Sequence, residues 1–156
     1  MSGTDRGIAL VTGASGGLGA DFASELAAGG ANLVLVARRE EALRKLADSL
    51  EKEFGISVLV MPADLTVPGT PDALYQQLRD QGVQVDILVN NAGLQKDAPF
   101  TEMTLDQWNF VLGVNLTGQF LCAREAIKEF LRRGVNGKSK SAGKIICMSS
   151  VHEVIP

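Results

Sequence analysis

Five short apolar runs recur along the chain. They cover residues 8–11, 33–36, 58–61, 85–89 and 144–148, with Asp86 and Lys144 as charged exceptions, and each gives way to a polar, glycine or proline residue within two positions. Continuous apolar runs of this length are typical of strands that are covered on both faces. The pattern therefore predicts five strands of a sheet buried between two layers.

Helical spacing of apolar residues fills the intervals in the first half. The expected inward faces are Leu18, Phe22 and Leu26, then Leu43, Leu46, Ala47, Leu50 and Phe54, then Leu74 and Leu78. Thr70 and Pro71 suit the cap and first turn of the third of these helices.

Two more helices are predicted in the second half. Thr104 and Gln107 form a capping-box pattern before Trp108, Val111 and Leu112. A longer helix is expected to follow and to end near Gly134. Its expected inward face is Leu116, Phe120, Ala123, Ile127 and Leu131.

This alternation of strands and helices predicts an α/β fold, a Rossmann-like doubly wound parallel sheet with five strands. Residues 1–156 contain no internal linker, so they are expected to form a single domain. In such sheets ligands bind in a crevice at the carboxyl ends of the strands.

Composition narrows the function classes. With 46% hydrophobic residues and a net charge of −3, the chain gives no electrostatic reason to expect nucleic acid or an anionic membrane as a partner. No apolar run approaches the roughly 20 residues that cross a bilayer, and the first residues are polar, so we expect a cytoplasmic location. Cys122 and Cys147 are expected to be buried free thiols, and no metal site is expected.

A glycine-rich turn joins the first strand to the first helix. Its residues 12–19 read Thr-Gly-Ala-Ser-Gly-Gly-Leu-Gly. Glycines let the backbone approach a pyrophosphate, and the helix N-terminus offers free N–H groups. The spacing fits both TGxxxGxG and GxxGxxG, so the turn alone leaves the enzyme group open. The expected phosphate contacts are Gly13, Ser15, Gly16, Gly17, Leu18 and Gly19.

Four further motifs reduce this ambiguity. Ala63-Asp64-Leu65 follows the third strand, residues 90–93 (Asn-Asn-Ala-Gly) follow the fourth, residues 114–118 (Val-Asn-Leu-Thr-Gly) lie in the long helix, and residues 148–150 (Met-Ser-Ser) end the fifth strand. Together, in this order, they make the chain resemble the short-chain dehydrogenase/reductase family along essentially its whole length.

The resemblance implies a role for each motif. Asp64 and Leu65 would hold the adenine of a nicotinamide dinucleotide, and Asn91, Ala92 and Gly93 would line the path to the nicotinamide. As catalytic residues, Asn115 would shape the helix and anchor a proton-relay water, and Ser150 would bind the oxygen of an alcohol or carbonyl substrate. Two simpler readings stay open: Asp64 caps a turn, and Asn115 satisfies buried backbone.

The end of the second strand bears on the choice of cofactor. An acidic residue there favours NAD, whereas a nearby arginine accommodates the 2′-phosphate of NADP. Arg38 and Arg39 stand here, and the first acid is Glu40. We therefore expect NADP rather than NAD. In the alternative, both arginines only decorate the next helix and pair with Glu41.

The family's proton-transferring pair, a tyrosine and a lysine four residues later, is not found within residues 1–156. The resemblance places it about a dozen residues after the position of Ser150, so the chain is expected to be C-terminally incomplete and to lack turnover alone. Tyr75 is the only tyrosine, and Arg79 lies four residues later. Both fall in the helix before the fourth strand, so we reject them as a substitute.

The two halves resemble different branches of the family. The first resembles NADP-preferring reductases of broad specificity, and the second resembles glucose 1-dehydrogenase, which makes Gln95 and His152 candidates for lining a sugar pocket. The leading hypothesis is an NADP(H)-dependent oxidoreductase that is a homo-oligomer in its full-length form. The alternatives are a non-catalytic NADP(H)-binding module or, less economically, a methyltransferase.

Overall fold

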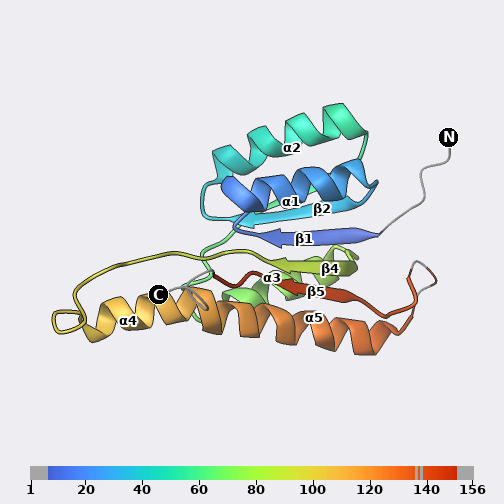
Figure 1. The fold of residues 1–156 in the computed structure, drawn as a ribbon. Helices are drawn as coiled ribbons and strands as arrows, with labels where there is room; N and C mark the ends of the chain where they lie inside the picture. Colours follow the sequence, from blue (N-terminus) through green and yellow to red (C-terminus); the bar gives the residue numbers. More distant parts are fainter. Residues whose placement is uncertain (1–6, 136, 138, 151–156) are drawn as a thin grey trace.

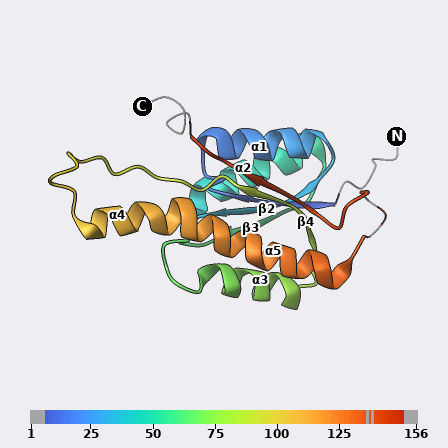
Figure 2. The same cartoon turned by 60° about the horizontal axis from the view of Figure 1, so that its bottom comes forward.

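The five predicted strands form one parallel sheet in a computed structural model that describes residues 7–135, 137 and 139–150. They are β1 (Ile8–Thr12), β2 (Asn32–Ala37), β3 (Val58–Pro62), β4 (Val85–Asn90) and β5 (Lys144–Cys147). Their order across the sheet is β3-β2-β1-β4-β5. Every neighbouring pair is parallel, so the carboxyl ends of all the strands lie at the same edge of the sheet (Figures 1 and 2). The predicted Rossmann-like fold class is confirmed.

Helices cover both faces of the sheet. α1 (Gly17–Ala28) and α2 (Glu40–Phe54) lie on one face, and α3 (Thr70–Asp80) and α5 (Gln119–Arg133) lie on the other (Figures 1 and 2). α4 (Leu105–Leu112) continues through a π-helical turn, η1 (Gly113–Gly118), directly into α5. The capping box of Thr104 and Gln107 is present at the start of α4. The two helices expected in this half are therefore one uninterrupted helical run.

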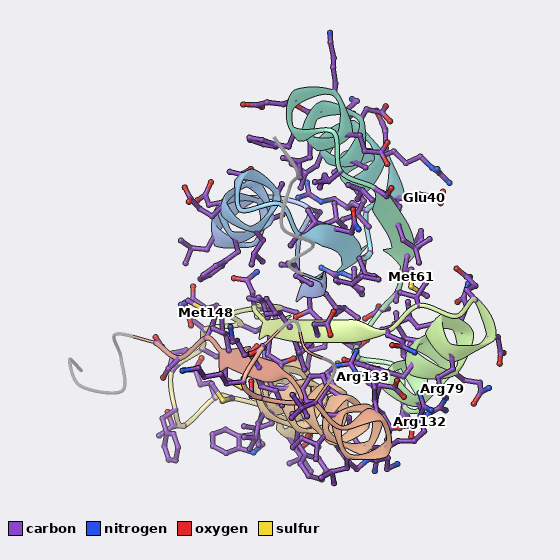
Figure 3. All side chains as sticks on the ribbon, turned by 90° about the vertical axis from the view of Figure 1, so that its right-hand side faces the viewer. Glu40, Met61, Arg79, Arg132, Arg133 and Met148 are labelled. Atoms are coloured by element: carbon purple, nitrogen blue, oxygen red, sulfur yellow. The ribbon has the colours of Figure 1, made fainter. Side chains whose placement is uncertain are left out.

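The alternation of residues along each strand divides the core into two clusters. In β1, Ala9 and Val11 pack with α1 and α2, whereas Leu10 packs with α3 and α5. The predicted stripe of α2 is confirmed, because Leu43 and Leu50 are buried in the first cluster. Figure 3 looks along the sheet and places Glu40 on the α2 side and Arg79, Arg132 and Arg133 on the α3 and α5 side.

The predicted inward face of the long helix is wrong for its four large residues, whereas Ala123 packs against the core cluster between the sheet, α3 and α5 as predicted. Leu116, Phe120, Ile127 and Leu131 are 63%, 59%, 46% and 79% exposed, and Ala123 is half-buried. The residues that face the sheet are instead mostly smaller: Val114, Gly118, Cys122, Ala126 and Phe130. Small side chains allow α5 to approach the sheet closely, so the larger apolar residues form an exposed stripe.

Three local expectations also need correction. Cys147 is exposed. It is the last residue of β5, which is an edge strand in the part of the chain that the structure describes. Gly69, not Thr70, is the N-cap of α3, and Thr70 is the first residue of the helix. Leu18 is 60% exposed in the first turn of α1, although Phe22 and Leu26 pack against the core as predicted.

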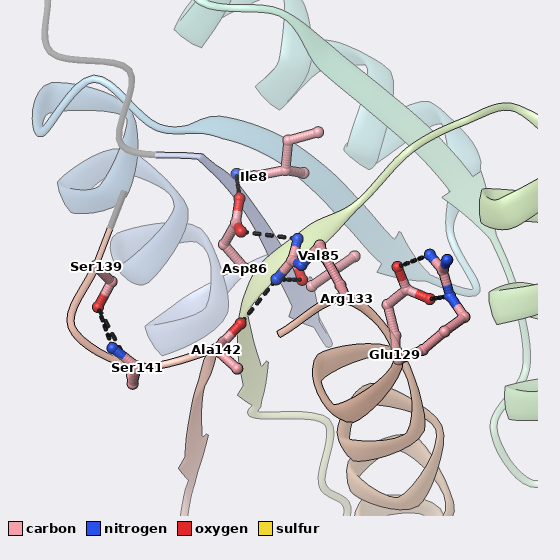
Figure 4. A network of polar contacts seen from close by, with 9 residues as sticks. Ile8, Val85, Asp86, Glu129, Arg133, Ser139, Ser141 and Ala142 are labelled. Carbon is pink, nitrogen blue, oxygen red and sulfur yellow. Dashed lines mark hydrogen bonds and ion pairs between the residues drawn. The ribbon is translucent and has the colours of Figure 1, made fainter. Parts of the chain in front are cut away.

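A buried ion pair fastens α5 to the sheet at the edge opposite the carboxyl ends. Nη1 of Arg133 lies 2.9 Å from Oδ1 of Asp86, and both side chains are largely buried. Nη2 of Arg133 donates to the carbonyl oxygens of Val85 and Ala142, and Oδ2 of Asp86 accepts from the backbone N–H of Ile8 (Figure 4). This network links β1, β4 and the approach to β5 to the end of α5.

Candidate cofactor-binding site

A cleft opens where β1, β2, β3 and β4 end. Its volume is about 300 Å³, within the range of small-molecule sites. The residues that line it come from the end of β2, from the segments that follow all four strands and from η1: Gly13, Ser15, Val36, Ala37, Arg38, Arg39, Ala63, Asp64, Leu65, Thr66, Ala92, Gly93, Leu94 and Val114. The cleft thus lies at the edge where the topology predicts a ligand.

The glycine turn has the geometry of one of its two candidate motifs. Gly13 and Gly17 adopt φ values of 66° and 54°, whereas Gly16 is extended at 161°. A methyl group at Gly19 would stand 2.5 Å from Nδ2 of Asn91 and closer still to the carbonyl oxygen of Gly13. The positions that require glycine are therefore 13, 17 and 19, which matches TGxxxGxG.

The N-terminus of α1 is open toward an incoming anion. Its N-cap is Gly16, which supplies no side-chain cap. A methyl group at Gly17 would meet no described atom within 4 Å. The first N–H groups of a helix need partners and carry partial positive charge. An arrangement of this kind fits a pyrophosphate.

The two arginines after β2 both line the cleft but act on different residues. Nη2 of Arg39 donates to the carbonyl oxygen of Ser15 at 3.0 Å and contacts Oγ of Ser15 at 3.3 Å. Arg38 lines the cleft, and its charge acts on Asp64. Glu41 pairs with Lys45 at 2.7 Å. The expected alternative, in which the arginines pair with Glu41, is therefore not what the structure contains.

Asp64 forms a tight turn at the end of β3. Its Oδ1 accepts from the backbone N–H of Thr66 at 2.9 Å and from the Thr66 hydroxyl at 2.7 Å. These hydrogen bonds, with a smaller contribution from the positive charge of Arg38, hold the pKa of Asp64 below its usual value. Asp64 thus caps a turn, as the simpler reading had it, while it and Leu65 also line the cleft.

Thr12, which was not among the predicted site residues, joins the ends of β1 and β4. Its hydroxyl accepts from the backbone N–H groups of Asn91 and Ala92 at 3.0 Å each and donates to the carbonyl oxygen of Val89. The side-chain amide of Asn91 donates to the carbonyl oxygens of Thr12 and Gly13. The turn after β4 is therefore bonded to the glycine turn.

Asn115, in η1, holds the next part of the same loop. Its Oδ1 accepts from the N–H of Leu94 and its Nδ2 donates to the carbonyl oxygen of Leu94, both at 2.9 Å. Asn115 thus satisfies backbone, as the simpler reading had it, but the backbone belongs to the loop after β4. Its neighbour Val114 lines the cleft.

The end of β5 is held by Asn90 and Gln119, neither of which was among the predicted site residues. Nε2 of Gln119 donates to the carbonyl oxygen of Met148 at 3.1 Å, and Nδ2 of Asn90 donates to the carbonyl oxygen of Gln119. The N–H of Met148 donates to the carbonyl oxygen of Asn90. Membership of the Asn-Asn-Ala-Gly motif could have pointed to Asn90, whereas Gln119 gave no signal.

The remaining predicted residues are not brought together with the cleft lining. Ser150 is exposed at the end of the segment after β5, and Gln95 is exposed in the loop after β4. Neither lines the cleft. His152 lies outside the described residues.

Tyr75 cannot take the place of a proton-transferring residue. It is 2% exposed in the core cluster between the sheet, α3 and α5. Burial, with smaller contributions from Cys122, Glu125 and Glu129, raises the pKa of its phenol far above the ordinary value. Arg79 turns away to bind Gln76. These observations support the rejection of this pair.

In the part of the chain that the structure describes, no three His, Cys, Asp or Glu residues are grouped to hold a metal ion. None of the described helices is long and apolar enough to span a membrane.

The fold is a Rossmann-like parallel sheet with a cleft at the carboxyl ends of its strands. The family model described as short chain dehydrogenase matches residues 7–156. The chain belongs to the short-chain dehydrogenase family.

Curated relatives agree with this assignment. 3beta-Hydroxysteroid dehydrogenase 1 of Eggerthella lenta is 40% identical over 148 residues, which cover 94% of this chain and 54% of that protein. Nodulation protein G of Rhizobium sp. (strain N33) is 42% identical over 143 residues, which cover 92% of this chain and 54% of that protein. The chain therefore spans about half the length of the curated relatives it matches.

Solved structures agree as well. L-Sorbose reductase from Gluconobacter frateurii, complexed with NADPH and L-sorbose, has a TM-score of 0.85 and 32% identity, with 99% of this chain and 56% of that chain covered. A short-chain dehydrogenase from Sphingobium yanoikuyae in complex with NADPH has a TM-score of 0.81 and 34% identity, with 93% and 54% covered.

Proposed function

We propose that the chain binds NADP(H) and forms the cofactor-binding part of an oxidoreductase. The reaction is hydride transfer between the nicotinamide and an alcohol or carbonyl substrate, with a sugar such as glucose as a candidate. The observation that carries the proposal is the cleft, which brings the glycine turn, two arginines and the Asp64 turn to one edge of the sheet. The NADPH complexes of the two similar structures support the choice of cofactor.

Each part of the cleft has a proposed task in holding the cofactor. The N–H groups at the start of α1 bind the pyrophosphate, and Arg38 binds the 2′-phosphate by a charge-assisted hydrogen bond. Asp64 and Leu65 contact the adenine, and residues 91–93 lead toward the nicotinamide. When bound, the dinucleotide supplies or accepts the hydride.

The substrate side is proposed from the family resemblance. Ser150 donates a hydrogen bond to the substrate oxygen, and Asn115 acts by holding the loop at Leu94, to which both of its side-chain polar atoms are bonded. Gln95 and His152 remain candidates for contacts with a sugar.

We further propose that the 156-residue chain binds cofactor without measurable turnover. Proton transfer by a positioned side chain typically contributes about 10²–10⁴-fold to the rate, and the one tyrosine, Tyr75, is buried away from the cleft. The measurement is NADPH oxidation with a panel of aldehydes and ketones, and NADP reduction with glucose. Turnover that is lost in His152→Ala would show that His152 replaces the phenol and would refute this proposal.

The cofactor proposal is tested by direct titration of the chain with NADPH and NADH. NADPH should bind more tightly, because the Arg38 guanidinium can pair with the additional phosphate. A charge-assisted hydrogen bond contributes about 1.5–3 kcal/mol, or about one to two decades in Kd. Arg38→Ala should bring the two affinities together. Equal affinities in the unaltered chain would refute the preference for NADP.

A second copy of the chain is the proposed partner of the exposed stripe on η1 and α5. Leu116 and Leu131 lie symmetrically about the peptide between residues 123 and 124, and so do Phe120 and Ile127. Around a two-fold axis at this point, Leu116 would face Leu131 of the second copy and Phe120 would face its Ile127. An isologous dimer requires such self-complementarity.

A further inference from the structure

We propose that Arg39 is a positioning residue of the glycine turn and that it raises the affinity for NADPH and NADH equally. Selectivity for the 2′-phosphate is left to Arg38. This proposal rests on the proposed binding of NADP(H). It gives different roles to two neighbouring arginines that the sequence alone does not distinguish.

The end of β2 holds two consecutive residues of the glycine turn. The N–H of Ala14 donates to the carbonyl oxygen of Val36 at 3.2 Å. One residue later, Nη2 of Arg39 binds the carbonyl oxygen and Oγ of Ser15. A methyl group at Gly16 would stand 3.6 Å from the same nitrogen. The Arg39 guanidinium therefore lies along the backbone at Ser15 and Gly16.

This turn gains from an external support. Glycine loses more conformational freedom on ordering than any other residue, and Gly13, Gly16 and Gly17 stand within five positions. The N-cap of α1 contributes no side-chain hydrogen bond. Holding a loop in its binding conformation increases affinity because less entropy is lost when the ligand binds. The gain applies to every ligand that uses the turn, with or without a 2′-phosphate.

Arg38 and Arg39 act on different turns at the edge of the cleft. Arg39 is engaged with the turn after β1, whereas the charge of Arg38 acts on Asp64 after β3. A group bonded to Ser15 in the free protein would have to leave that contact to bind a phosphate elsewhere. Arg38 has no such contact to Ser15 among the described residues. It is therefore the arginine assigned to the phosphate.

The test uses the 156-residue chain with Arg39→Ala, Arg38→Ala and, as a matched loss of charge, Arg44→Ala. Arg44 pairs with Glu40 on the exposed side of α2 and does not line the cleft. The first readout needs no cofactor: it is hydrogen exchange at the amide of Ala14, measured by NMR. The second is the Kd for NADPH and for NADH, each at low salt and at about 0.5 M salt, where the Debye length falls to roughly 4–5 Å.

In Arg39→Ala, exchange at Ala14 should be faster, and both Kd values should rise by the same factor, about 3- to 10-fold, which is the size expected for a hydrogen bond at an exposed site. The factor should persist at high salt. Arg38→Ala should change the ratio of the two Kd values and leave exchange at Ala14 as it was. Arg44→Ala should change neither.

Three results would overturn the proposal. Weaker binding of NADPH alone in Arg39→Ala would make Arg39 a phosphate ligand. An effect that vanishes at high salt would reduce it to a distant charge. Unchanged exchange at Ala14 would mean that Arg39 does not hold the turn. If the unaltered chain bound neither cofactor, the proposed function would fail, whereas the exchange measurement would still decide whether Arg39 positions the turn.

Discussion

Gly19→Ala tests the close approach on which the glycine turn depends. The added methyl group would stand 2.5 Å from Nδ2 of Asn91 and closer to the carbonyl oxygen of Gly13. Non-bonded carbon contacts are optimal at about 3.5–4.0 Å, so either the turn or the Asn91 side chain must move. Movement of Asn91 would weaken its hydrogen bonds to Thr12 and Gly13. We therefore expect the substitution to destabilise the contact between the ends of β1 and β4.

The magnitude follows from these two effects. Overpacking by one methyl group in a tight site costs about 1–3 kcal/mol, and the loss of a hydrogen bond costs about 0.5–1.5 kcal/mol. We expect Gly19→Ala to lower the free energy of unfolding by about 2–4 kcal/mol, a large share of the roughly 5–15 kcal/mol typical of a domain.

Gly16→Ala is the matched control, because it adds the same methyl group three residues earlier. Gly16 has an extended φ of 161°, and the nearest described atom would be 3.6 Å from the methyl carbon. Its effect on stability should stay within about 1 kcal/mol, because the methyl group meets no close atom and the main cost is that alanine is less favourable than glycine at an N-cap.

Urea unfolding followed by circular dichroism at 222 nm gives both values. Equal stability of the two variants would refute the assignment of Gly19, rather than Gly16, as the position of close packing. Loss of stability in Gly16→Ala alone would favour the GxxGxxG spacing.

Three other predictions concern the rest of the molecule. Arg133→Met should lower the free energy of unfolding by about 3 kcal/mol, because it removes one side of the buried ion pair between Arg133 and Asp86, and unchanged urea unfolding would contradict this. Phe120→Glu should convert a dimer into monomers in light scattering, and a dilution-resistant monomer of the unaltered chain would argue against the dimer. In the folded chain the exposed thiol of Cys147 should react rapidly with a thiol reagent. Burial raises the pKa of Cys122 to about 12 and should protect this thiol until urea unfolds the chain. Equally fast reaction of both thiols in the folded chain would refute this.

The sheet could be predicted because its signals are local. Each strand is a short apolar run, and a strand buried on both faces leaves that pattern in the sequence wherever it lies in the sheet. The stripe of α2, with Leu43 and Leu50 inward, is equally local, since an otherwise polar helix has only one apolar face.

The orientation of α5 could not be predicted in this way. The helix has two candidate faces, one with large residues such as Phe120 and Ile127 and one with small residues such as Cys122 and Ala126. Hydrophobicity favours the large residues, but the distance from helix to sheet decides, and that distance is a property of the packed fold. Glu125 and Glu129 are buried because Lys128 and Arg132 pair with them, which spacing alone does not indicate.

The candidate site also has a part that could be predicted from local sequence and a part that could not. The residues that line the cleft follow strands, so a strand prediction and a motif were enough to name Gly13, Arg38 and Asp64. The bonds that fix the geometry of the site join Leu94 to Asn115, 21 residues apart, and Met148 to Gln119, 29 residues apart.

Both of these bonds involve residues of η1 or the residue directly after it. Val114, in η1, also lines the cleft. A Cβ added at Gly118 would lie within 4 Å of Leu65. One helical turn thus contacts the segments that follow β3, β4 and β5. Because these contacts arise only once the strands have assembled in their order, the single sequence names the residues at each strand end but not the turn that holds the strand ends in place relative to one another.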